Sequence, residues 1–166
     1  MALVVRTRPD WAMQHEMLPR HYSELKDALR SGDPDARFRA RDEIGLTYAL
    51  LGMYREQIEN DRQAVVLRPE AKAPRRRLAY AQLRLNHPYR ALRIARELQS
   101  IDPDDPLSAR VSDTVEQFLR RWEYERANGH EAPDGAPAMV LADRFPLVSE
   151  GERQRLRRDY HFTTLQ

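Results

Sequence analysis

The sequence IGLTYALLGMYREQIENDRQAVVLRPE at residues 44–70 is followed, 34 positions further along, by LAYAQLRLNHPYRALRIARELQSIDPD at residues 78–104. Both stretches place apolar, small and proline residues in the same order. The matched pairs are Ile44 and Leu78, Gly45 and Ala79, Leu51 and Leu85, Ile58 and Leu92, Ala64 and Leu98, Leu67 and Ile101, and Pro69 and Pro103. A period of this length, with two helical segments in each unit, is typical of helical repeat proteins.

Each unit is predicted to form two helices joined by a tight turn. In the first unit the apolar positions fall on two helix faces, formed by Ile44, Tyr48 and Leu51 and by Ile58, Ala64 and Val65. Gly52 separates these faces, and glycine tolerates the positive φ at which a helix ends. Pro69 ends the second helix because proline cannot continue one. The second unit repeats the arrangement, with a turn at residues 86–88 and with Pro103.

This pattern resembles the tetratricopeptide repeat family over residues 38–105. The elements that carry the resemblance are Ile44-Gly45-x-x-Tyr48, Gly52-x-Tyr54 and Pro69 in the first unit, and Leu78-Ala79, Ala91 and Pro103 in the second. The sequence departs from the family at Arg41 and Arg75, where tryptophan is favoured, at Gln57 and Asp61, which replace a small and an aromatic residue, and at Gln82, which replaces a tyrosine. The resemblance implies an all-α fold, a short right-handed solenoid of helix pairs.

The repeats need flanking helices, because two units alone bury too little apolar surface. We expect an N-terminal extension at 1–18, a helical domain at 19–127, a linker at 128–138 and a C-terminal tail at 139–166. Within the domain we expect a helix over 19–31, repeats at 38–71 and 72–105, and an amphipathic capping helix at 107–127. In the tail, Ser149 and Glu152 have the spacing of a capping box and predict a short basic helix to about Tyr160.

The composition excludes several classes of protein. The chain is 41% hydrophobic and 33% charged, and its mean hydropathy is −0.79. It has no apolar run long enough to span a membrane, and we expect a cytoplasmic protein. The absence of cysteine excludes disulfides, thiolate metal sites and a cysteine nucleophile.

No motif for catalysis, a metal or a cofactor stands out. The five histidines are His15, His21, His87, His130 and His161. Their spacing forms no helical metal-ligand pair, so we expect solvated or capping roles for them. The phosphate-binding and nucleophile motifs are missing. We therefore expect a protein that is not an enzyme and that has no metal site and no cofactor.

In the tetratricopeptide repeat family the first helices of successive units line a concave groove that holds peptides. Carried over to this sequence, the resemblance places in the groove Arg39, Asp42, Leu46, Ala49 and Leu50 from the first unit, Ala73, Arg76, Arg77, Tyr80, Leu83 and Arg84 from the second, and Arg110 from the capping helix. Asp42 and Leu46 stand where the carboxylate-clamp subtype has lysine and asparagine. Residues 71–98 carry eight basic side chains and only one acid, Glu97. Because arginine pairs with carboxylates, the expected partner is an acidic, partly apolar peptide, and the expected function is that of an adaptor or scaffold.

Three other interpretations remain open at this point. The arginines at 75–77 could form only a solvated face. The same arginines could bind nucleic acid phosphates, although the chain has only Lys26 and Lys72 as lysines and lacks interleaved aromatic residues for base stacking. The apolar segment 139–148 could dock on the repeats of its own or a neighbouring copy, which would make the chain a homo-oligomer or an autoinhibited scaffold.

Overall fold

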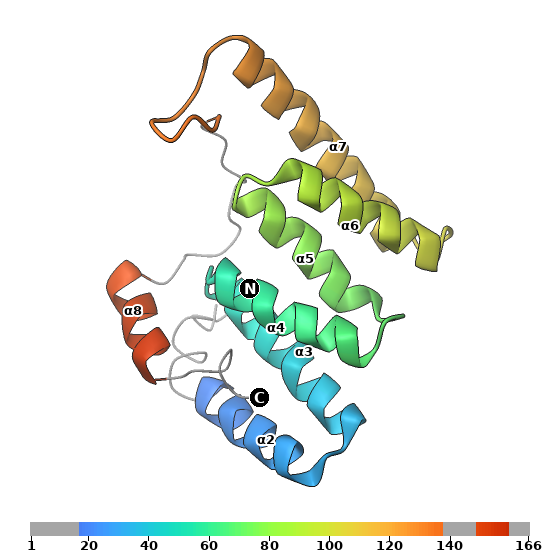
Figure 1. Ribbon diagram of the computed structural model, residues 1–166, viewed down its shortest axis with the longest axis vertical. Coiled ribbons are helices and arrows are strands. Elements are labelled where there is room, and N and C mark those ends of the chain that lie inside the picture. Colours follow the sequence, from blue (N-terminus) through green and yellow to red (C-terminus); the bar gives the residue numbers. More distant parts are fainter. Residues whose placement is uncertain (1–16, 138–148, 160–166) are drawn as a thin grey trace, which may run out of the picture.

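A computed structural model describes residues 17–137 and 149–159, and their regular elements are helices (Figure 1). The helices are α2 (Leu18–Ser31), α3 (Pro34–Leu50), α4 (Tyr54–Leu67), α5 (Lys72–Arg84), α6 (Pro88–Ile101), α7 (Pro106–Ala127) and α8 (Glu150–Asp159). Within these residues the only β-type pairing is an isolated bridge between Glu131 and Pro137. The predicted all-α fold class is confirmed.

Local chemistry sets the helix boundaries. Gly32, Gly52 and Asn86 have φ values of 70°, 71° and 58°, and each lies in the turn after a helix, where a left-handed residue lets the chain reverse. Asp33 caps α3 by accepting a hydrogen bond from the Asp35 amide at 3.0 Å. Asp105 caps α7 in the same way through the Ser108 amide at 3.2 Å. The turns predicted at Gly52 and at residues 86–88 are confirmed.

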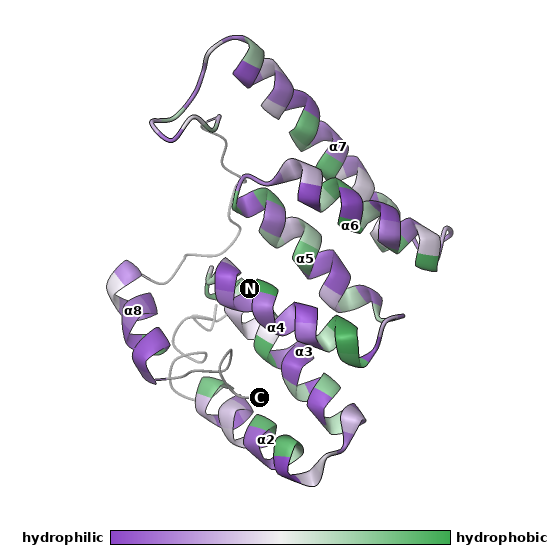
Figure 2. Cartoon of the chain, in the orientation of Figure 1, coloured by the Kyte–Doolittle hydropathy of each residue, from purple (hydrophilic) through white to green (hydrophobic). Residues whose placement is uncertain are grey.

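The helices of the domain form a stack in chain order, with α2 at one end and α7 at the other (Figure 1). Each of the helices α2 to α6 packs against the helix that follows it, and α3 and α7 both also pack against α5. Hydrophilic and hydrophobic residues are interspersed along the helices, whereas α8 is predominantly hydrophilic (Figure 2). Such helices bury one face against their neighbours and leave the other in water.

Two clusters of buried apolar side chains hold this stack together. The larger cluster joins α4, α5, α6 and α7, and includes Ile58, Leu83, Leu98, Val115 and Trp122. The second joins α2, α3, the α3–α4 turn and α8, and includes Leu18, Leu25, Ile44, Leu51, Met53 and Leu156. Helix α7 turns one apolar face to the first cluster and closes that end of the domain, as the sequence predicted. No described helix combines the length and the apolar composition needed to cross a membrane.

The flanking segments differ from expectation in two places. Leu18 is fully buried within α2, so the helical domain begins earlier than residue 19. The predicted linker has local structure up to residue 137: the Ala132 amide donates to the Ala136 carbonyl at 2.6 Å. Ala136 packs on the larger cluster and Pro137 is buried, whereas most of residues 128–135 are exposed. The expectation that segment 139–148 docks on the repeats lies outside the described residues.

Helix α8 forms where the capping box predicted it. The Ser149 hydroxyl accepts a hydrogen bond from the Glu152 amide at 3.2 Å. Leu156 is the buried residue of this helix, and Arg157 forms an ion pair with Glu56 of α4. The C-terminal helix therefore docks on the side of the stack, beside α2 and the α3–α4 turn (Figure 1).

Candidate functional site

The arginine at position 77 ties three helices together. Its Nη2 atom lies 2.7 Å from Oδ1 of Asp61 on α4, pairs with the carboxylate of Asp42 on α3 and donates to the Asp42 carbonyl at 3.1 Å. Gln57 adds hydrogen bonds to Asp61 Oδ2 at 3.1 Å and to the Arg77 carbonyl at 3.0 Å. Two residues expected in the groove, Asp42 and Arg77, are thus engaged in helix packing.

Asp61 is 0% exposed, which makes it the most costly charge of this network. Burial raises the pKa of Asp61 to about 6, because removing the carboxylate from water outweighs the hydrogen bonds from Arg77 and Gln57. Gly45 creates the space for this carboxylate: a Cβ atom at position 45 would lie 2.1 Å from Asp61 Oδ1. Gly45 and Ala79, the small residues at matched positions of the two units, are both buried.

Arg76, Tyr80 and Arg84 lie four residues apart on α5, and all three are partly exposed. Arg76 Nη1 is 3.3 Å from Oδ2 of Asp105, the residue that caps α7. The Arg84 guanidinium lies 5.5 Å from the centre of the Tyr54 ring on α4, and Tyr80 packs at the edge of the larger cluster. Of these three residues, Arg76 therefore contacts a carboxylate of the same chain, and Arg84 contacts an aromatic ring.

The other expected groove residues differ widely in exposure. Leu46 is 47% exposed, and Arg39 and Arg110 are also exposed, whereas Ala49, Leu50 and Ala73 are partly buried. Leu83 is only 1% exposed and lies in the larger apolar cluster. Its assignment to a binding groove was wrong, because the side chain is buried in the cluster between α4, α5, α6 and α7.

The interpretation of Arg75, Arg76 and Arg77 as a solvated face was also wrong. Each side chain is partly buried and has a partner. Arg75 Nη1 donates to the carbonyl oxygens of Pro69 and Ala71, at the turn that precedes α5. The arginines of this stretch therefore serve to join helices and turns, and the excess of positive charge seen in the sequence overstates the charge available to a ligand.

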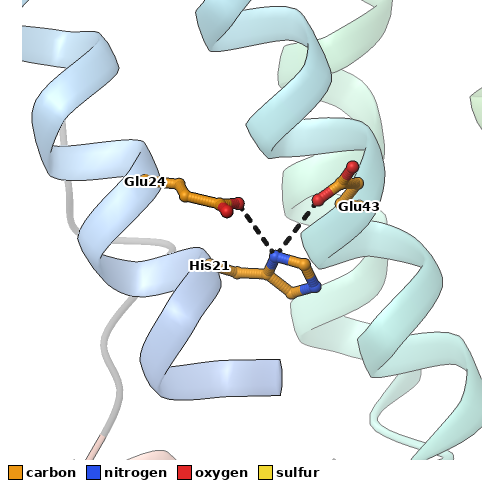
Figure 3. Close-up of side chains that lie close together, drawn as sticks. All are labelled: His21, Glu24 and Glu43. Atoms are coloured by element: carbon orange, nitrogen blue, oxygen red, sulfur yellow. Dashed lines mark hydrogen bonds and ion pairs between the residues drawn. The ribbon is translucent and has the colours of Figure 1, made fainter. Parts of the chain in front are cut away.

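A second polar cluster lies between α2 and α3 (Figure 3). His21 is 3% exposed, and its Nδ1 atom lies 3.3 Å from Glu24 Oε2 and 3.2 Å from Glu43 Oε2. Arg20 donates to the other oxygen of Glu24 at 2.8 Å. The expectation of a solvated or capping role for His21 was wrong. The i, i+3 spacing of His21 and Glu24 was visible in the sequence, but Glu43 approaches from a different helix.

Comparisons of the chain with family models, with curated proteins and with solved structures gave no match.

Proposed function

We propose that this chain is a non-enzymatic adaptor built on a tetratricopeptide-like solenoid, and that the surface formed by α3 and α5 binds an acidic, partly apolar peptide. This proposal depends on the ion pair between Asp42 of α3 and Arg77 of α5, which fixes how residues of the two helices align. The helices run in the same direction (Figure 1). One and two turns beyond the ion pair, Leu46 and Ala49 of α3 are therefore level with Tyr80 and Arg84 of α5.

This register combines an apolar and a cationic element on one surface. Leu46 is a large apolar side chain that is 47% exposed, and Tyr80, at the same level of α5, is partly exposed. Arg84 supplies a guanidinium group, which binds carboxylates through paired hydrogen bonds. A peptide with an apolar residue next to glutamate or aspartate complements this arrangement.

Arg76 already shows how a carboxylate is held at this surface. Its partner Asp105 is an internal carboxylate that also caps α7, so a ligand carboxylate must compete with it. This competition reduces the share of binding that we assign to Arg76. Arg77 belongs to the fold, because its guanidinium is occupied by Asp42 and Asp61.

The test is binding of a fluorescent peptide of alternating glutamate and leucine, with a lysine–leucine peptide as the opposite-charge probe. Truncating an arginine that bonds a carboxylate costs about 1.5–3 kcal/mol, and less at an exposed site. Arg84→Ala should therefore weaken binding of the acidic peptide by about tenfold. Added salt should reduce the difference in affinity between wild type and Arg84→Ala. Arg93→Ala changes an exposed arginine on α6 and is the matched control. Equal affinity of wild type and Arg84→Ala, with both folded by circular dichroism, contradicts the proposal.

A second function is favoured by the docking of α8, which would make the chain an autoinhibited scaffold. Leu156 shares a buried cluster with Leu18, Leu51 and Met53, and Arg157 pairs with Glu56. Replacing Leu156 by aspartate in the full chain should release the helix. A rise in affinity for the acidic peptide supports autoinhibition. Unchanged affinity would show that α8 only covers apolar residues of α2, α3 and the α3–α4 turn.

A further inference from the structure

We propose that His21, Glu24 and Glu43 form a binding site for one divalent first-row transition metal ion, such as Zn²⁺, between α2 and α3. The three ligand atoms are the Nδ1 nitrogen of His21 and one carboxylate oxygen from each glutamate, and they lie within 4.8 Å of one another. One imidazole nitrogen with two carboxylate oxygens is a donor set that suits Zn²⁺, Co²⁺ and Mn²⁺.

The spacing of the donor atoms fits a shared ion. With metal–ligand bonds of about 2.1 Å, the separations of 3.3 Å and 3.2 Å between His21 Nδ1 and the two glutamate oxygens subtend about 100° at the metal. That angle lies between the right angle of an octahedral site and the wider angle of a tetrahedral one. The two glutamate oxygens lie within 4.8 Å of each other, and both reach the ion once they are within about 4.2 Å, twice the bond length.

A hydrogen bond alone accounts less well for this geometry. One ring nitrogen carries at most one proton, yet two carboxylates converge on Nδ1 (Figure 3). Both separations exceed the 2.7–2.9 Å that is usual for a charge-assisted hydrogen bond. The second ring nitrogen, Nε2, is buried and has no hydrogen-bond partner among the described residues. The polar contacts that orient the ring are therefore those with the two glutamates.

An outer contact orients one of the two carboxylate ligands. Arg20 holds Oε1 of Glu24 and leaves Oε2 directed at His21. Outer contacts of this kind orient metal ligands.

The two glutamates also line a pocket of about 470 Å³, whose charged lining residues are Arg20, Glu24, Asp27, Arg39 and Glu43. Carboxylates outnumber guanidinium groups in this lining, which favours a cation. The pocket is open to water, and water can occupy the coordination positions that the protein leaves free.

The experiment uses the full chain, freed of metal with a chelator and titrated calorimetrically with ZnCl₂. Wild type should bind one equivalent, and Glu43→Gln and Glu24→Gln should each bind at least tenfold more weakly. The Glu43 side chain is 54% exposed, so its isosteric change leaves the core intact. His130→Gln is the matched control, because His130 is an exposed histidine that contacts one carboxylate, Glu125, at 2.6 Å.

A thermal melt gives a second readout, because an ion that binds the folded chain raises its melting temperature. Zn²⁺ should raise Tm in wild type and in His130→Gln, and should do so much less in Glu43→Gln. Visible absorption of bound Co²⁺ should disappear in the same variant. Failure of wild type to bind one equivalent, or equal binding by wild type and both glutamate variants, overturns the proposal.

Discussion

Replacing Gly45 by alanine tests the central packing feature of the repeats. The added Cβ would lie 2.1 Å from Oδ1 and 2.8 Å from Cγ of Asp61, and neither distance is tolerated between non-bonded atoms. Asp61 cannot withdraw freely, because Arg77 and Gln57 hold both of its oxygens. The substitution must therefore move α3 away from α4 or displace a buried carboxylate from its partners.

The cost can be bounded from these contacts. Overpacking of a close helix contact costs about 1–3 kcal/mol, and separating a buried ion pair costs about 3–5 kcal/mol. Alanine regains about 1 kcal/mol of helix propensity over glycine. We expect a net loss of about 2–4 kcal/mol, and for a chain of this length that lowers Tm by roughly 10 °C.

The assay is thermal and urea unfolding of Gly45→Ala beside Gly151→Ala. Position 151 is the matched control, because a Cβ added there meets no heavy atom within 4 Å. We expect Gly151→Ala to be at least as stable as wild type, because position 151 lies in α8, where alanine has the higher helix propensity. An unchanged Tm in Gly45→Ala would refute the packing of α3 against α4. If Gly45→Ala costs as much in an Asp61→Ala background as alone, then the clash is not with Asp61.

Three further substitutions test other parts of the structure. Burial raises the pKa of Asp61 from 3.8 to about 6, so between these pH values the folded state binds more protons than the unfolded state. In urea titrations, the unfolding free energy of wild type minus that of Asp61→Asn should therefore fall as pH rises through this range. A rise would show that the attraction of Arg77 for the Asp61 carboxylate outweighs the effect of burial. Leu156→Ala should release α8 and speed amide exchange across residues 149–159, because truncating a buried leucine costs about 2–5 kcal/mol of stability. Arg158→Ala changes an exposed side chain of the same helix and should leave the exchange rates unchanged. Asp33→Ala removes the α3 cap and should lower the unfolding free energy by about 1 kcal/mol; no change in chemical denaturation would contradict this assignment.

The helices could be predicted because their signals are local. Gly52, Pro69 and the 34-residue spacing fix turns and helix ends through backbone geometry, which does not depend on the partner surface. The buried faces of α3 and α7 followed from apolar periodicity for the same reason. Even the close approach at Gly45 was visible, since a small residue recurs at the matched position Ala79.

The polar contacts could not be predicted, because each joins residues from different helices. Nothing in the sequence near Arg77 indicates that its partners are Asp42 and Asp61. Glu43 reaches His21 from the helix that follows, over a separation of 22 positions. Leu83 was misplaced because the position equivalent to a groove residue in the family faces the larger cluster in this chain.

The departures from the tetratricopeptide repeat pattern are themselves linked by physical chemistry. Arg41, which stands where the family favours tryptophan, is 3% exposed and donates to Asn60 Oδ1 at 2.8 Å. Burial lowers the pKa of Arg41 to about 10. Asp61 replaces an aromatic residue and needs Arg77 opposite it. Replacing Arg41 alone by an apolar residue would remove the hydrogen bond to the buried Asn60 Oδ1. Replacing Asp61 alone would leave Arg77 with Asp42 as its remaining carboxylate partner, so each departure is coupled to its partner residue.

This coupling changes how charge at the α3 and α5 surface should be interpreted. An arginine whose partner is buried belongs to the fold, and its removal should lower stability at any salt concentration, because buried pairs are screened little. Arg77 is such a residue, since Asp61 is inaccessible. Arg84 is partly exposed and its guanidinium lies 5.5 Å from the centre of the Tyr54 ring, so its electrostatic interactions with a ligand should weaken with salt. Salt dependence therefore separates the arginines that build this domain from those that could bind a partner.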